Sequence, residues 1–170
     1  MLEQKGKDGL KDVPKNIKDN KEAMAETIEN NLRKVIIDER PANPAYYDKM
    51  SEVLNELIKL RKEASKKYEE YLKQIIALIR LVKKPNSSNA YPVTLNTSAR
   101  RNLFDNLGKN EELAIELDER ILRTKKADWK DHKIKSREVY LAVAEFMVEY
   151  QVNDVTVDYI FELVKNQKDY

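Results

Sequence analysis

The side chains most able to do chemistry in this chain lie in a basic stretch between Arg120 and Arg137. Eight basic residues accompany two acidic ones there, which gives a net charge of about +6. Such a stretch can contact nucleic-acid phosphates, dock an acidic partner protein or simply be solvated. Arg100 and Arg101 would extend a basic face if the helix that carries them lies nearby. The basic residues of the stretch are Arg120, Arg123, Lys125, Lys126, Lys130, Lys133, Lys135 and Arg137.

The motifs of familiar catalytic sites do not occur in the sequence. His132 is the only histidine and there is no cysteine, so ligands for a zinc-type site are lacking. Gly108-Lys109 resembles part of a phosphate loop, but Asn110 follows where Ser or Thr is needed, and no second glycine lies upstream at the required distance. Glu3-Gln4-Lys5 has the Glu-x-Lys shape of nuclease cores without the strand and aspartate which that chemistry needs. We therefore expect no catalytic, metal-binding or cofactor-binding residue in this segment, and no enzymatic activity of its own.

Two aromatic residues in polar connections are candidate contacts for a partner protein. Tyr91, followed by Pro92, lies in a connection of about a dozen residues between 85 and 97, and connections of this length in a compact domain are functional or mobile. Trp129, the only tryptophan, lies in a second polar connection. An exposed tryptophan at a docking surface is a typical hot spot. The alternative is that Trp129 is buried as a cap on the helical core.

The composition predicts an all-α fold. The chain has 170 residues, of which 41% are hydrophobic and 36% charged, and only three are glycine. This leaves enough apolar residues for a packed core, and the many Lys, Glu and Leu residues favour helices. The absence of cysteine, and an apolar run that ends at Arg80 after only a few residues, predict a cytoplasmic protein that does not enter a membrane.

A long amphipathic segment organises the predicted fold. Between Pro44 and Lys83, apolar and aromatic positions recur at alternating steps of four and three, with Arg61 as the only break. This pattern is typical of one face of a long helix, and about 40 residues would form a rod of roughly 60 Å. We therefore predict a helical bundle of about six helices packed around one long central helix over 44–83. The stripe consists of Met50, Leu54, Leu57, Ala64, Tyr68, Tyr71, Ile75, Leu78 and Val82.

Capping residues predict where the other helices begin. Residues 1–18, rich in Lys, Asp and Gly, are expected to be a flexible linker or arm from a larger protein, and 19–170 a single helical domain. Gly108 lies where a positive φ would end a helix. The other helices are expected over about 19–40, 97–107, 110–126, 136–149 and 156–166. Their expected N-caps include Asp19 or Asn20, Thr97 or Ser98, and Asn110, and Asn43 would cap the central helix.

Eight short segments of the chain carry a family resemblance. They are NKEA (20–23), AETIENN (25–31), NPAYYDKMS (43–51), YEEYL (68–72), YP (91–92), RNLFDNLG (101–108), DW (128–129) and VKNQ (164–167). Together these segments resemble the C-terminal helical region of the restriction (R) subunit of type I restriction-modification systems. The resemblance extends over nearly the whole chain from about Leu10.

The resemblance implies an assembly role for this segment. The complete subunit of that family is an ATP-dependent type I site-specific deoxyribonuclease, with a nuclease domain and two motor domains that use ATP and Mg and pull in DNA. Its C-terminal helical domain is implicated in joining the motor to the methyltransferase core. The expected partners are therefore the methyltransferase and specificity subunits, the motor domains of the same subunit and, through the complex, DNA. The alternative function is an accessory DNA-contacting module that uses the basic face.

Overall fold

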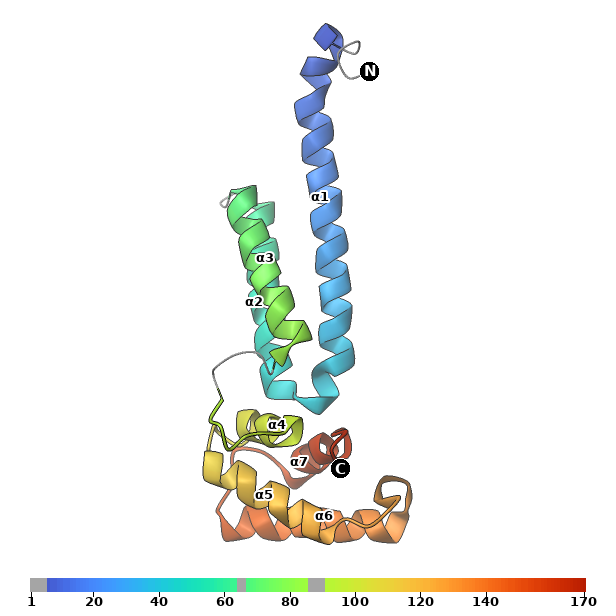
Figure 1. Ribbon diagram of the computed structural model, residues 1–170, viewed down its shortest axis with the longest axis vertical. Coiled ribbons are helices and arrows are strands. Elements are labelled where there is room, and N and C mark those ends of the chain that lie inside the picture. The colour runs from blue at the N-terminus through green and yellow to red at the C-terminus, as the bar shows by residue number, and fades with distance from the viewer. Residues whose placement is uncertain (1–5, 64–66, 86–90) are drawn as a thin grey trace.

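The structure is a computed structural model that describes residues 6–63, 67–85 and 91–170, with side chains from Asp19 onward. Over these ranges the chain forms seven α-helices and no strand, which confirms the predicted all-α class. Figure 1 shows two layers, with α1, α2 and α3 along the long axis of the molecule and α4 to α7 across their lower end. The helices are α1 (Gly6–Glu39), α2 (Pro44–Lys62), α3 (Tyr68–Lys83), α4 (Ser98–Asn106), α5 (Glu111–Thr124), α6 (Lys133–Glu149) and α7 (Val157–Lys165).

The prediction of one continuous helix over 44–83 is wrong, because the chain forms two helices there. α2 and α3 run antiparallel, side by side (Figure 1). The Tyr46 hydroxyl at the start of α2 donates to the carbonyl of Leu81 at the end of α3 over 2.6 Å, so these two ends are adjacent. The apolar spacing continues through both helices because each of them turns one face towards a shared core. Ala64, a member of the predicted stripe, lies outside the described residues.

Helix α1 begins earlier than predicted. It starts at Gly6 rather than near Asp19 or Asn20, so the backbone of residues 6–18, which we predicted to be a linker, is helical. Gly9 and Pro14 both disfavour a helix interior, Gly9 because of its backbone entropy and Pro14 because it lacks a backbone N–H and its ring crowds the preceding turn. These local signals pointed to a linker, although the backbone is helical there. Residues 1–5 of the predicted arm lie outside the part of the chain that the structure describes. The helix ends at Glu39, before a proline, as predicted.

The buried apolar side chains form two separate clusters, one in each layer. The first lies among α1, α2 and α3, and includes the fully enclosed Leu54, Tyr71 and Ile75. The second lies among α4, α5, α6 and α7, and includes Phe146 and Ile160. The predicted bundle is therefore built as two helical layers, each with its own core, and the contact between the layers needs a separate explanation.

Local capping signals gave most helix starts correctly. Asn43, Thr97 and Asn110 each accept a hydrogen bond from a backbone N–H in the first turn of the helix that follows. Gly108 follows α4 with a φ of +69°, the left-handed conformation predicted for it. α6 begins before the predicted start near residue 136, because the Nδ1 atom of His132 caps it.

Candidate functional site

Buried amide side chains connect the two layers where the start of α2 meets α4 and the end of α7. Asn43, Asn106 and Gln167 are only 2%, 6% and 2% exposed. Burying an amide costs free energy unless its donors and acceptors find partners. Here they find one another and a few neighbours, so they form one connected set, which we call the junction network. The junction network consists of Asn43, Tyr91, Asn102, Asp105, Asn106, Tyr159 and Gln167.

Asn43 begins α2 and fastens it to α4 with the same side chain. Its Oδ1 atom accepts from the backbone N–H of Tyr46 at 3.2 Å, which caps α2, and from Nδ2 of Asn106 at 2.8 Å. Its Nδ2 atom donates to Oδ1 of Asn102 at 3.1 Å and to Oδ2 of Asp105 at 2.8 Å. Both donors and both acceptor positions of this amide are therefore used, which offsets the cost of its burial.

Asn106 extends the junction network from α4 towards α7. Its Oδ1 atom accepts from the backbone N–H of Ala45 at 3.1 Å and from the hydroxyl of Tyr159 at 2.7 Å. Its Nδ2 atom also donates to the carbonyl of Asn102 within α4, at 2.7 Å. A single side chain thus contacts α2, α4 and α7, and fixes their relative positions.

Gln167 closes the junction network just after α7. Its Nε2 atom donates to the carbonyl of Ala42 at 2.7 Å and to that of Leu163 at 2.8 Å. Its Oε1 atom accepts from Nδ2 of Asn102 at 2.8 Å. The backbone carbonyl of Gln167 accepts from the ammonium of Lys130. The turn between α1 and α2 is thereby attached to the C-terminal end of the chain.

Tyr91, one of the predicted partner contacts, belongs to the junction network. Its hydroxyl donates to Oδ2 of Asp105 at 2.5 Å, and its ring meets that of Phe104 edge-on with centroids 5.9 Å apart. Burial, and then the hydrogen bond to Asp105, raise the pKa of Tyr91 far above its ordinary value. Tyr91 therefore remains protonated and keeps this bond across the physiological range.

A groove of about 470 Å³ lies beside the junction network, between the start of α2 and α4. Its walls combine apolar and aromatic surface with charged side chains of both signs, a composition that suits a segment of a partner protein. Tyr91 lines it, so the predicted contact residue lies at its wall rather than in open solvent. The aromatic residues of the groove are Tyr46, Tyr91 and Phe104, and its exposed charged residues include Lys49, Glu52 and Lys109.

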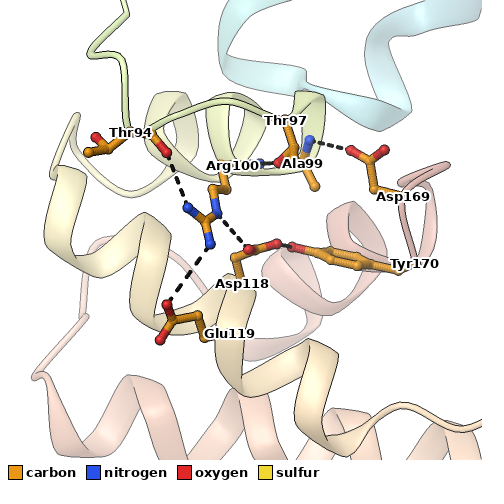
Figure 2. A network of polar contacts seen from close by, with 8 residues as sticks. All are labelled: Thr94, Thr97, Ala99, Arg100, Asp118, Glu119, Asp169 and Tyr170. Atoms are coloured by element: carbon orange, nitrogen blue, oxygen red, sulfur yellow. Dashed lines mark hydrogen bonds and ion pairs between the residues drawn. The ribbon is translucent and has the colours of Figure 1, made fainter.

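A second polar network joins α4, α5 and the C-terminal residue (Figure 2). Nε of Arg100 donates to Oδ2 of Asp118 at 2.7 Å, and Nη1 donates to the carbonyl of Thr94 at 3.1 Å. The other oxygen of Asp118 accepts from the hydroxyl of Tyr170 at 2.5 Å. Burial first, and then the bond to Asp118, raise the pKa of Tyr170. Asp118 is 3% exposed, so Arg100 serves as its counter-ion and is not free to join a basic face.

A third buried group lies inside the layer of α1, α2 and α3. Glu29 accepts from Nε of Arg61 at 2.7 Å and from Nη2 at 3.0 Å, a two-pronged ion pair. It also accepts from the hydroxyl of Tyr71 at 2.8 Å. Burial, followed by this hydrogen bond, raises the pKa of Tyr71. Arg61, which interrupts the apolar stripe in the sequence, is thus the partner of a buried carboxylate on α1.

Trp129, the other predicted partner contact, is buried. Its side chain is 2% exposed and packs within the lower core, with its ring 6.2 Å from that of Phe161. Its Nε1 atom is the one buried side-chain polar atom without a hydrogen-bond partner among the described residues. Of the two interpretations stated above, the structure therefore shows the buried cap on the helical core and excludes an exposed docking residue, because the indole adds more stability by filling the core than it would gain in solvent.

The predicted basic face is largely used inside the molecule. Five of its members donate to acidic side chains or backbone carbonyls within the chain: Arg100, Arg120, Lys126, Lys130 and Lys135. The side chain of Arg123 is 64% exposed and lies 3.8 Å from Glu116. Within the described residues, no side-chain hydrogen bond or ion pair involves Arg101, Lys125, Lys133 or Arg137, and these four lie on or beside three different helices. Six of the ten predicted basic residues therefore have polar partners within the chain.

Sequence reasoning identified only part of this site. It gave Asn43 as a helix cap and Tyr91 as a candidate contact, but it missed Asn102, Asn106 and Gln167. Asn102 and Asn106 are one helical turn apart and next to apolar residues, and this spacing is the sequence signal that could have indicated a buried amide pair.

Over the described ranges, no group of three or more His, Cys, Asp or Glu side chains is placed to hold a metal ion. None of the described helices combines the length and the apolar character that crossing a membrane requires. Comparisons with protein-family models, with curated proteins and with solved structures found no match.

Proposed function

We propose that this chain is an assembly domain that joins the motor part of a type I restriction subunit to its methyltransferase and specificity subunits. The observation that carries the proposal is that several of the segments with the resemblance meet in the folded chain, although they are far apart in the sequence. Four of the segments that carry the family resemblance, 43–51, 91–92, 101–108 and 164–167, each contribute to the junction network. Residues that carry the resemblance therefore help to hold the two helical layers together.

A fixed angle between the layers is useful to a domain that joins two larger bodies. The junction network is made mainly of neutral amides whose donors and acceptors are paired, so it holds the layers without depending on salt or on physiological pH. The groove beside it is formed by both layers, which makes it a preformed surface for a partner. A preformed surface binds with a smaller loss of conformational entropy than one that must be ordered.

Capture by the cognate methyltransferase–specificity complex tests this proposal. The chain is immobilised and exposed to the complex with and without DNA, at low and at high salt. We expect stable capture without DNA, at both salt concentrations. Lys49→Glu, at the exposed rim of the groove, is expected to weaken capture by about tenfold, as a wrongly charged rim residue does. Lys34→Glu, the same change on an exposed face of α1, is the matched control and should leave capture unchanged.

The same experiment separates docking from the DNA-contacting alternative. No capture at either salt concentration, with salt-sensitive retention on DNA alone, would contradict the docking proposal and favour a role for the unpaired cations. Equal losses in Lys49→Glu and Lys34→Glu would show that the groove is not the contact surface.

A further inference from the structure

Helix α6 carries a second apolar face that nothing in the described chain covers. Ile134, Leu141 and Val148 are 68%, 46% and 80% exposed, although their neighbours on α6 form part of the lower core. The three residues repeat at one heptad position, so they lie in a line along the helix. At 100° per residue this line points away from the core-facing Val139 and Phe146. Figure 1 shows α6 along the end of the molecule farthest from the N-terminus, where another molecule can reach it.

The charged residues beside this line are complementary to those of a second copy of α6 that runs antiparallel to the first. If two copies of α6 lie antiparallel with Leu141 opposite Leu141, then Ile134 of one copy lies opposite Val148 of the other. The same register places Arg137 opposite Glu145 of the second copy, and this happens twice because of the twofold symmetry. Arg137 and Glu145 are both exposed, and neither has a side-chain hydrogen bond or ion pair among the described residues.

We propose that α6 is a homodimerisation surface, on which two copies of this chain pack antiparallel about Leu141. The apolar line supplies burial of Ile, Leu and Val, and the two Arg137–Glu145 pairs select the antiparallel register. A parallel arrangement would place Arg137 near Arg137 and Glu145 near Glu145, so like charges oppose it. This surface lies on α6, whereas the groove of the proposed docking function lies between α2 and α4, so the two proposals can fail independently.

A charge exchange between two variants tests whether these charged residues meet across the interface between the two copies. The wild-type chain should have a mass of twice 20.0 kDa in sedimentation experiments. Arg137→Glu places two carboxylates opposite each other, and Glu145→Arg places two guanidinium groups opposite each other, so each variant alone should be monomeric. Mixing the two variants should restore a dimer that contains one copy of each, because every carboxylate then meets a guanidinium. Leu141→Lys should also give monomers, since two ammonium groups would meet at the twofold axis.

Two controls keep the result tied to this face. Ile37→Lys, at an apolar residue of α1 that is 62% exposed, should leave the dimer intact. Thermal melting of every variant shows whether the chain still folds, and the substituted positions are exposed, so we expect little change there. A wild-type chain that stays at 20.0 kDa up to about 0.5 mM, a concentration at which even weak specific contacts are populated, would overturn the proposal. A dimer that persists in Arg137→Glu and in Leu141→Lys would overturn it as well.

Discussion

Arg61 is the one charged residue in an otherwise apolar stripe, and its surroundings explain why it is there. The side chains of Arg61 and Glu29 are 10% and 5% exposed, and the guanidinium meets the carboxylate with two hydrogen bonds. A buried ion pair of this kind adds little net stability, but removing one partner leaves the other buried without a counter-charge. Together with Tyr71, the pair links α1, α2 and α3, so it also selects how these three helices meet.

Replacing Arg61 alone by an apolar residue should therefore reduce the stability of the fold more than replacing Arg61, Glu29 and Tyr71 together. We expect Arg61→Met to lower the free energy of unfolding by about 3 kcal/mol, because Glu29 is left unpaired in the core. The triple variant Arg61→Met, Glu29→Met, Tyr71→Phe removes every member of the group. Its free energy of unfolding should fall by less than that of the single variant. Urea unfolding measures both. A triple variant less stable than Arg61→Met would show that the ion pair itself is a net source of stability.

At the scale of helices, the pairing of α2 with α3 depends partly on protonated tyrosines. The hydroxyl of Tyr47 donates to the carbonyl of Val82 at 3.4 Å. Burial first, and then the negative charge of Glu39, raise the pKa of Tyr47 from 10.0 to about 12. The unfolded chain therefore releases this proton before the folded chain does. The contribution of Tyr47 to stability is fully present below pH 10 and is lost as the pH rises from 10 to 12.

We expect the urea midpoint to fall between about pH 10 and about pH 12, and Tyr47→Phe to make this fall smaller. The phenylalanine variant has no proton to lose at that position, although other buried tyrosines still contribute to the fall. Tyr150→Phe, at an exposed tyrosine, is the matched control and should leave the fall unchanged. A fall of the same size in Tyr47→Phe as in the wild type would show that Tyr47 ionises freely in the folded chain.

The helices could be predicted from the sequence wherever their signals are local. A cap such as Thr97, or a left-handed glycine such as Gly108, acts within one turn of its own helix. The break between α2 and α3 could not be predicted, because both helices of an antiparallel pair present the same periodic face to the core. A period of 3.6 residues shows which face of a helix is buried. It does not show whether the chain continues as the same helix or reverses direction into a second, antiparallel helix.

The candidate site was harder to predict because its parts are distant in sequence. Asn43 bonds to α4, and Gln167 bonds back to the turn before α2, so each amide gains its partner only after the two layers meet. Before that contact, an asparagine or glutamine in a helical segment is indistinguishable from a solvated one. The burial of Trp129 could not be predicted from its neighbours either, because it lies in a polar connection and yet its side chain packs in the core.

At the scale of the whole molecule, two cores joined by a polar junction should unfold together only while the junction is intact. Trp129 is the only tryptophan and lies in the lower core, so its fluorescence reports on the layer of α4 to α7 alone. Circular dichroism reports on all helices. We expect the two thermal transitions to coincide in the wild type, as in a two-state molecule. Asn106→Ala removes a member that bonds to α2, α4 and α7, and should separate the two midpoints.

Arg61→Met provides the converse test, because it destabilises the upper core without touching the junction. In a coupled molecule this change lowers the midpoint seen by Trp129 fluorescence, although Trp129 lies in the other layer. In the double variant Arg61→Met, Asn106→Ala, the thermal midpoint measured by circular dichroism should still fall. The midpoint measured by Trp129 fluorescence should stay unchanged, because the upper and lower cores then unfold separately. If Arg61→Met alone leaves the thermal midpoint of Trp129 fluorescence unchanged, the two layers unfold as independent units. The junction network would then only set the angle at which they meet.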